Sequence, residues 1–299
     1  MKGNRGFLAM AATMGALTLT VAMPSAAVAQ ATSTGVVQAQ NALARTAPQF
    51  VAYHNLTPAQ QTERFNTLRG QGYRPITVSV STDFSGRTRY AGMWSVSGRA
   101  MGGDLPWAMY QDMSADGYQR RFDQLAAQGY QPAVVSATGS GDGARFAAIF
   151  LKNPGSRFVA KHGIKPAELL RMSGTARQDG LMLTSVDTYG TASATRYVAV
   201  WSANPGQVSW HVRVSLSQER HEAEFRKYVA LGFRPTSITV SATGRYTTVW
   251  RDDKPGAWHS YIGMTAAGYQ GRFDELKAKG FYPIHINAEM GRYAAIWTK

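Results

Sequence analysis

The sequence predicts an α+β protein made of five tandem repeats, each of roughly 50 residues with one helix and one β-hairpin. Two observations support this fold class. A sequence motif, here called the recurring phrase, occurs five times. It begins with Gly, an aromatic residue and Pro, continues with a variable stretch, and ends with Arg-aromatic-x-x-x-aromatic. At the Gly-aromatic-x-Pro step of each copy, the apolar residues change from helical spacing to period-two alternation. Units of this length bury a core only by stacking on their neighbours, so we expect one continuous repeat domain.

The recurring phrase divides the chain into units at approximately 50–106, 107–157, 158–209, 210–257 and 258–299. The first copy runs from Gly72 and Pro75 to Arg89, Tyr90 and Trp94. The third copy has Leu183 in the place of the proline, but it keeps the step from arginine to tryptophan. The aromatic pairs of the other units are Phe146 and Phe150, Tyr197 and Trp201, Tyr246 and Trp250, and Tyr293 and Trp297.

Four units are expected to open with an extended segment that begins at an aromatic residue and ends at a Ser or Thr, the N-cap of the following helix. These segments are Phe50–Thr57, Trp107–Ser114, Trp210–Ser217 and Trp258–Thr265. In the second unit, Tyr118, Phe122 and Leu125 then recur at helical spacing. In the third unit, Ser173 and Ala176 replace the corresponding Phe and Leu, which predicts a displaced or shortened helix. Four helices are expected to end at glycines in the left-handed conformation, namely Gly72, Gly129, Gly232 and Gly280.

The proline that follows starts a strand, and a Gly/Ser/Thr-rich turn then leads to a second, antiparallel strand that carries the Arg-aromatic step. The two aromatic residues of this strand share one face, with a small residue between them. We interpret them as core residues and not as a platform for a ligand. The five hairpins are expected to join into one long, curved antiparallel sheet with the helices on one face. The sequence leaves open whether this sheet forms a half-barrel or a closed ring.

The N-terminal segment Met1–Ala29 is typical of a signal peptide. It has Lys2 and Arg5 at its start, an apolar middle, and an Ala-Val-Ala cleavage site that ends at Ala29. Residues 30–49 are interpreted as a flexible leader. We therefore expect a secreted or periplasmic protein, and no segment has the length of apolar sequence that a membrane span needs. The chain contains no cysteine, so it has no disulfides, and packed apolar surface must stabilise it.

The chain carries a formal net charge of +14, and the loss of Lys2 and Arg5 with the signal peptide leaves +12. Such an excess favours an anionic partner. Export and the lack of a clustered recognition helix argue against nucleic acid. An anionic or polar extracellular polymer, or a protein, is the expected partner, although a basic charge that serves only solubility is the alternative.

In these features the chain resembles the bacterial tandem repeat family, which also forms the amino-terminal half of fungal polyglycine hydrolases. The resemblance rests on the Gly-aromatic-Arg-Pro step, the Arg-Tyr-x-x-x-Trp step and Pro-Gly turns such as Pro205-Gly206, and it covers residues 50–299. It implies little about activity. In those hydrolases the nucleophilic serine belongs to a separate domain similar to serine β-lactamases, and the repeats have no settled role.

No catalytic motif is found. A β-lactamase-like site needs Ser-x-x-Lys, and no serine here has a lysine three residues later. The Gly-rich segment at Gly139–Gly143 leads into a strand, so it is interpreted as a turn and not as a phosphate cradle. The histidines lack metal-ligand spacing. We therefore assign no catalytic residue, expect no metal or cofactor, and regard enzymatic activity as less well supported than its absence.

Two sets of repeat-equivalent residues are candidates for ligand binding. In every unit, the fourth residue after the proline position is polar. If the units stack in register, these residues form one line that could bind an extended polymer, and the alternative is a solvated strand face. The arginines of the recurring phrase either pair with carboxylates or form a basic stripe. The polar set is Ser79, Ser136, Asp187, Thr239 and Asn287, and the arginine set is Arg89, Arg145, Arg196, Arg245 and Arg292.

The sequence therefore favours an exported, non-catalytic binding domain with an extended basic surface. A hydrolase of peptidase or glycosidase type, with a site assembled between units around Asp187, is the first alternative. The second is an accessory scaffold for a separate serine hydrolase. The oligomeric state does not follow from the sequence.

Overall fold

The structure is a computed structural model, and it describes residues 49–96, 105–153, 157–254 and 256–299. The predicted signal peptide and all but the last residue of the predicted leader lie outside the described residues. The repeats belong to one compact unit, Asn41–Lys299. Among the described helices, none combines the length and the apolar character that crossing a membrane requires.

Every unit contains an opening strand, a helix, an inner strand and a middle strand, in that order along the chain. The opening strands are β1 (Phe50–Leu56), β4 (Trp107–Met113), β7 (Phe158–Ile164), β10 (Trp210–Leu216) and β13 (Trp258–Met264). The helices are α1 (Pro58–Gly70), α2 (Ala115–Ala126), α3 (Pro166–Gln178), α4 (Gln218–Ala230) and α5 (Ala266–Ala278). The inner strands are β2 (Arg74–Thr82), β5 (Tyr130–Thr138), β8 (Leu181–Gly190), β11 (Arg234–Val240) and β14 (Tyr282–Glu289). The middle strands are β3 (Thr88–Ser95), β6 (Arg145–Lys152), β9 (Thr195–Ala203), β12 (Tyr246–Arg251) and β15 (Arg292–Thr298).

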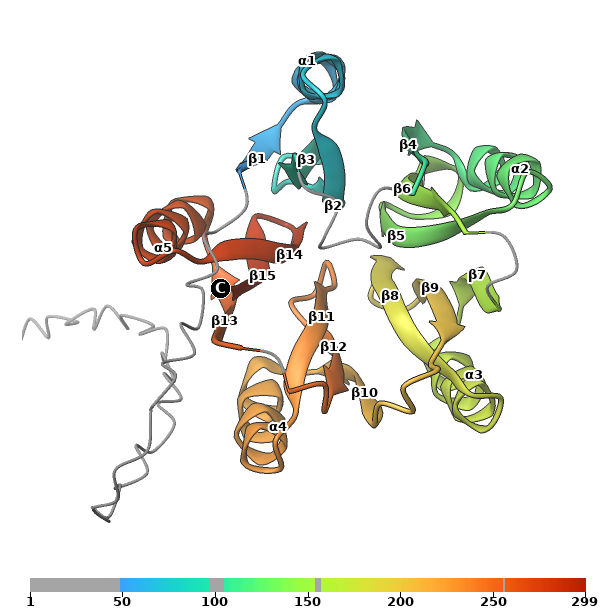
Figure 1. Cartoon of the computed structure of the whole chain (residues 1–299), viewed down its shortest axis with the longest axis vertical. Coiled ribbons are helices and arrows are strands. Elements are labelled where there is room, and N and C mark those ends of the chain that lie inside the picture. The colour runs from blue at the N-terminus through green and yellow to red at the C-terminus, as the bar shows by residue number, and fades with distance from the viewer. Residues whose placement is uncertain (1–48, 97–104, 154–156, 255) are drawn as a thin grey trace, which may run out of the picture. The chain divides into compact units, whose positions relative to one another are not determined.

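The three strands of each unit form a separate antiparallel sheet, in the order opening, middle, inner. Helices and hairpins are confirmed, but the expectation of one long curved sheet, open or closed, is wrong. The reason is that the free edge of each inner strand meets side chains of the next unit and does not pair with another strand. Figure 1 shows the five inner strands nearest the centre and the helices at the periphery.

The helix ends follow the sequence signals. Thr57, Ser114, Ser217 and Thr265 cap their helices, each accepting a hydrogen bond from the backbone N–H three residues later. The glycines that follow the helices have positive φ, from +70° at Gly180 to +86° at Gly232. Helix α3 has 13 residues, as α1 does, so it is not shortened. Its Ser173 is buried and accepts a hydrogen bond from the indole N–H of Trp201 at 3.2 Å.

The aromatic pairs of the middle strands lie in the core, as expected, and all ten side chains are at most 4% exposed. The opposite face of each middle strand packs on the preceding unit. For example, Ala147 and Ile149 of the second unit join the core of the first, which contains Trp94. The inner strands are buried on both faces around the polar set, so this set does not form the solvated strand face that the sequence left open.

The first unit also packs on the last. Ala91 and Met93 share a core cluster with Tyr269 and Trp297 of the fifth unit. The ring of Phe50, which opens the first unit, lies 6.1 Å from that of Phe273 on α5. Trp107, Phe158 and Trp258 pack in the same way on the phenylalanines of the preceding helices. The units therefore follow one another around a common axis, with contact between the fifth and the first.

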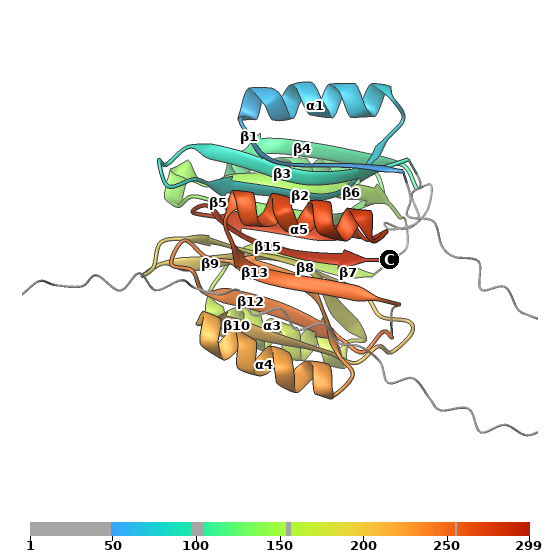
Figure 2. The same ribbon diagram turned by 90° about the vertical axis from the view of Figure 1, so that its left-hand side faces the viewer.

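The two ends of this axis differ in what they expose. The strand registers place the hairpins at one end, together with the starts of the helices. They place the chain links between units and the ends of the helices at the other. Figure 2 shows the hairpins on the left and the C-terminus on the right. We call these the hairpin face and the link face.

Candidate binding site on the central axis

The predicted polar set lies on the inner strands around the axis, and we call Ser79, Ser136, Asp187, Thr239 and Asn287 the central layer. All five side chains are at most 4% exposed. Each accepts a hydrogen bond from a backbone N–H of the preceding unit, at distances from 2.9 to 3.1 Å. The donors, in the same order, are the N–H groups of Ala288, Val80, Ala137, Thr188 and Val240.

The physical reason for this layer is the edge of the inner strand. One edge of each inner strand pairs with the middle strand of its own unit, and the other edge would leave backbone N–H groups unpaired inside the protein. A short polar side chain on the next inner strand supplies the missing acceptor. Since each donor immediately follows the central-layer residue of its own unit, the same contact repeats five times and connects the fifth unit to the first.

Asp187 is the charged member of the central layer and contacts three units besides its own. Its Oδ2 accepts from the hydroxyl of Ser136 at 2.6 Å and from the N–H of Ala137 at 3.0 Å. Its Oδ1 accepts from the N–H of Thr188, the hydroxyl of Thr239 and the amide of Asn287. Burial raises the pKa of Asp187 above the usual value for an aspartate, and the hydrogen bonds from Ser136, Thr239, Ala137 and Thr188 act against that increase.

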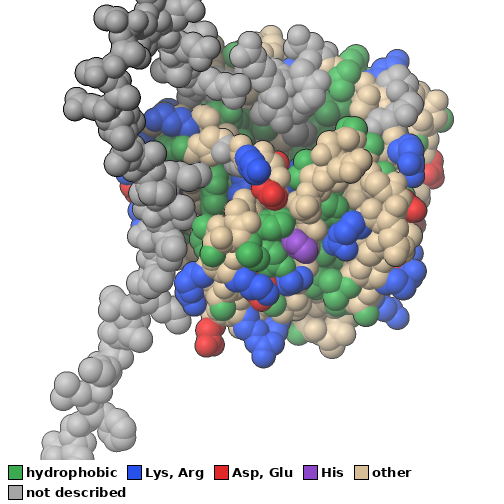
Figure 3. Space-filling model, turned by 60° about the horizontal axis from the view of Figure 1, so that its bottom comes forward, with side chains coloured by type: hydrophobic (Ala, Val, Ile, Leu, Met, Phe, Trp, Pro, Cys, Tyr) green, Lys and Arg blue, Asp and Glu red, His purple; other side chains and the backbone are tan. Residues whose placement is uncertain are grey.

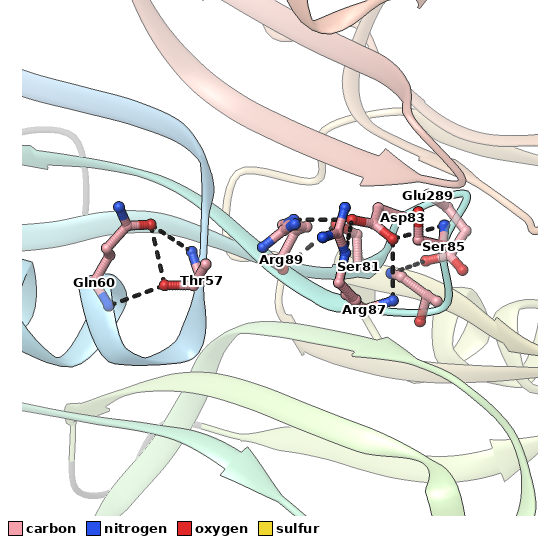
Figure 4. A network of polar contacts seen from close by, with 9 residues as sticks. Thr57, Gln60, Ser81, Asp83, Ser85, Arg87, Arg89 and Glu289 are labelled. Atoms are coloured by element: carbon pink, nitrogen blue, oxygen red, sulfur yellow. Dashed lines mark hydrogen bonds and ion pairs between the residues drawn. The ribbon is translucent and has the colours of Figure 1, made fainter.

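A second carboxylate lies two residues nearer to the hairpin face. The Oε2 of Glu289 accepts from the hydroxyl of Thr138 at 2.7 Å and from the N–H of Thr82 at 3.2 Å. Figure 4 shows Glu289 beside the first-unit hairpin that carries Ser81 and Asp83. Burial raises the pKa of Glu289 to about 7, and the charge of Asp187 adds to this increase.

On the link-face side of the central layer lies a cavity of about 310 Å³. Ser136, Asp187 and Asn287 line its deep end. Its walls include polar groups two residues nearer the link face, among them Ser185, Ser237 and His285. Ser185 accepts from the N–H of Val135 at 3.0 Å. Arg234, Arg251 and Tyr282 lie near the opening, at the link-face ends of their strands.

The predicted arginine set lies apart from this cavity, at the hairpin-face starts of the middle strands or just before them. Arg89 contacts Asp83 of its own hairpin at 3.0 Å, and Figure 4 shows this pair together with Arg87. Arg145 lies 3.4 Å from Asp112, and Arg245 donates to the backbone oxygen of Ser215 at 2.8 Å. Arg196 donates to a backbone oxygen of its own strand. The guanidinium of Arg292 lies over the ring of Phe84 of the first unit.

The structure therefore gathers the polar set around the axis and spreads the arginine set around one face. Ligand binding by either set stays a prediction. Within the described ranges, no group of three or more His, Asp or Glu side chains is arranged to hold a metal ion. Asp187, the centre of the hydrolase alternative, has both oxygens occupied by protein donors. A general base needs a lone pair directed at the substrate, so this arrangement disfavours a catalytic role for Asp187.

Sequence reasoning missed the residues that shape the cavity, Arg251 and His285 above all. Both residues differ in type from those at the equivalent positions of the other four units, and this difference is visible in the sequence. The positions equivalent to Arg251 hold Ser95, Leu151, Ser202 and Thr298, and those equivalent to His285 hold Thr77, Val134, Ser185 and Ser237. Arg251 and His285 each occur in one unit only, so the recurring pattern does not point to them.

Comparison with known protein families agrees with this architecture. The family model described as "Polyglycine hydrolase-like, structural repeat" matches the chain five times, at residues 47–96, 104–153, 155–204, 207–253 and 255–299. Each match contains one opening strand, one helix, one inner strand and one middle strand. The matches cover most of the chain, and the protein therefore belongs to the polyglycine hydrolase-like structural repeat family.

Proposed function

We propose that this protein is an exported, non-catalytic repeat domain that binds an anionic extracellular or cell-envelope polymer through its link face. The observation that carries this proposal is the distribution of exposed charge. At the link face, exposed cationic side chains outnumber exposed acidic ones among the described residues. The cationic ones are Arg69, Lys152, Arg157, Arg177, Lys254, Lys277, Lys279 and Lys299.

The hairpin face has a more even balance of charge. There Arg89 lies close to Asp83 and Arg145 to Asp112, and these carboxylates reduce the field that a polymer would meet. Figure 3 shows one side of the molecule, on which Lys and Arg are more abundant than Asp and Glu and are separated by neutral and apolar side chains. A positive field of this kind attracts polyanions over several ångströms and is weakened by salt.

The non-catalytic part of the proposal is supported by the bonding of the central layer. Its polar side chains hold neighbouring units together, and the carboxylate of Asp187 is engaged by five donors. Export is supported by the sequence of Met1–Ala29 alone. An accessory scaffold would also show no turnover by itself. It would differ in its partner, which would be a separate serine hydrolase and not a polymer.

The test compares two triple variants that remove the same number of charges from different places. Replacing Lys152, Lys254 and Lys277 by Gln removes three exposed cations from the link face. Replacing Arg64, Arg120 and Arg220 by Gln removes three exposed cations away from it. Binding to immobilised anionic envelope polymers and to peptidoglycan is measured at low and high salt.

We expect the link-face variant to bind roughly 10-fold or more weakly at low salt, since each exposed charge contributes on the order of 0.5 kcal/mol. The second variant should bind within about 3-fold of the parent protein. Equal losses in the two variants, or binding that is insensitive to salt, would contradict the proposal. Release of a soluble product from any polymer would contradict its non-catalytic part.

A further inference from the structure

The cavity on the axis has one polar side and one apolar side. The five units share one fold, so the fold alone does not explain this difference. The third and fourth units line it with hydroxyl groups and Arg251. The first and second units line it largely with aliphatic side chains, and the fifth contributes both aliphatic and polar ones. The polar lining is Thr184, Ser185, Thr236, Ser237 and Arg251, and the aliphatic lining includes Ile76, Ala133, Val134 and Ile284. Its volume of about 310 Å³ is at the lower end of the range for small-ligand sites.

Arg251 brings a positive charge to this cavity without a carboxylate partner. Its Nη2 donates to the backbone oxygen of Leu183 at 2.9 Å, while its Nε is buried and has no hydrogen-bond partner. No ion pair within 4.0 Å joins Arg251 to a described acidic side chain. Burial lowers the pKa of Arg251 to about 10, against the effect of the nearby Asp253 charge, and the side chain therefore stays charged at neutral pH.

The neighbouring arginine shows what is missing at Arg251. Arg234 faces Arg251 across the pair of strands β11 and β12, and it makes two hydrogen bonds of 2.7 Å to the carboxylate of Asp253. This bidentate geometry is the one that guanidinium groups adopt with carboxylates. Arg251 has the same donors and no such carboxylate. A ligand carboxylate would supply the missing partner.

The other charged and titratable groups that line the cavity do not repel an anion bound at its opening. Asp187 lies in the central layer, and its fourth-unit equivalent, Thr239, is five residues along β11 from Arg234. At about 3.3 Å per residue, this places Asp187 on the order of 15 Å deeper than Arg251. Burial lowers the pKa of His285 to about 4, so its imidazole is neutral at neutral pH and adds no charge.

We propose that this cavity binds the free carboxylate end of a peptide whose last residue has a small aliphatic side chain. Arg251 holds the carboxylate, the hydroxyl groups of the third and fourth units contact the peptide, and the aliphatic lining accepts the side chain. The inference rests on the proposed binding function of the link face, into which the cavity opens. It adds a ligand class and an anchoring residue to that function.

The test uses three small probes and calorimetry or NMR titration on the full protein. N-acetyl-alanyl-alanine presents the proposed chemistry, its C-terminal amide lacks the carboxylate, and propionate has the carboxylate and a short aliphatic chain without the peptide. We expect saturable binding of the first probe and at least 10-fold weaker binding of the other two. If the amide binds as tightly as N-acetyl-alanyl-alanine, the carboxylate does not anchor the ligand. If propionate binds as tightly, the cavity does not recognise the peptide part of the ligand.

Variants then assign the anchor. Arg251→Gln should weaken binding of N-acetyl-alanyl-alanine at least 10-fold, and Arg251→Lys should weaken it less because the charge remains. Arg220→Gln removes an exposed charge of the same unit away from the link face and should change the affinity by less than 2-fold. An unchanged affinity in the folded Arg251→Lys and Arg251→Gln variants overturns the assignment. If Arg251→Gln fails to fold, the Lys variant and the probe series still decide.

The same experiments separate this inference from the proposed function. Binding of polymers that persists while N-acetyl-alanyl-alanine fails to bind overturns the cavity site alone. If the parent protein binds none of the anionic polymers, the proposed function is wrong. Absence of binding for every probe overturns the cavity site whatever the polymers do.

Discussion

At the scale of single residues, the central layer shows that different side chains fill one hydrogen-bonding role. Ser, Thr, Asp and Asn all carry an oxygen close to the backbone, and each accepts a bond from the strand edge of the preceding unit. An apolar residue there would leave a buried N–H unpaired, at a cost of about 1–3 kcal/mol. This explains why every unit is polar at this position.

Glu289 provides a residue-scale prediction about pH. Its pKa is raised from 4.5 to about 7, so the folded protein holds this proton more tightly than the unfolded chain does. The resulting stabilisation is fully present below pH 4.5 and is lost as the pH rises through 7. At about 1.4 kcal/mol per pKa unit, the whole effect is roughly 3 kcal/mol.

The substitution Glu289→Gln removes this ionisation and keeps an oxygen acceptor. The free energy of unfolding of the variant, measured relative to the parent by chemical denaturation, should therefore increase between pH 4.5 and pH 8 by up to about 3 kcal/mol. Glu63→Gln on the exposed surface of α1 is the control and should change stability by less than about 0.5 kcal/mol at either pH. Parallel pH profiles for Glu289→Gln and the parent would show that Glu289 does not titrate as described.

At the scale of elements, each opening strand contains a bulge just before its helix. The residue there has positive φ in all five units, from +54° to +72°, and the register of the strand pair shifts at this point. These residues are Asn55, Asp112, Gly163, Ser215 and Gly263. Gly, Asn and Asp tolerate this conformation best, so four of the five residues suit it. The bulge turns the chain away from the sheet and into the helix.

Helix α3 provides the element-scale prediction, because its N-cap is Lys165, which makes no side-chain capping bond. Helix α1 begins with Thr57-Pro58 and has Gln60 at the third position, and α3 has Lys165-Pro166 and Glu168 at the same places. Lys165→Thr should therefore complete a capping box and raise the free energy of unfolding by roughly 0.5–1 kcal/mol.

Lys165→Ala is the matched control, since it removes the same charge from the helix start without adding a cap. We expect Lys165→Thr to exceed Lys165→Ala in thermal and chemical denaturation. Equal stability of the two variants would mean that charge and not capping limits α3.

At the scale of the whole molecule, contact between the last unit and the first is what makes the repeats one structure. The N–H of Ala288 donates to Ser79, the N–H of Met290 donates to the backbone oxygen of Thr82, and Phe50 packs on Phe273. Each of the described units thus packs on two neighbours, whereas the terminal repeats of an open array have one neighbour and must cap the other face.

This arrangement predicts tolerance of circular permutation. A permutant that begins at Arg157, ends at Asn153 and joins Lys299 to Gln49 through a short flexible linker keeps all five contacts between units. It should unfold in one cooperative transition, within about 2 kcal/mol of the parent. A chain that lacks residues 255–299 loses two of these contacts and should lose cooperative unfolding.

The experiment measures denaturation by circular dichroism and tryptophan fluorescence for the parent, the permutant and the truncated chain. A permutant that fails to fold while the truncated chain stays cooperative would show that the contact between the first and last units contributes little.

The sequence by itself determined the five units, their helices and hairpins, the caps at Thr57, Ser114, Ser217 and Thr265, and the core position of the aromatic pairs. These features depend on neighbours in the chain, where spacing and residue type act directly. The tertiary structure alone decided that the sheets stay separate, that the polar set turns inward around an axis, and that Arg251 and His285 line a cavity. These features depend on residues far apart in sequence. A polar side chain that bonds to a neighbouring unit and one that faces solvent look the same in a sequence, because the difference lies in what covers them.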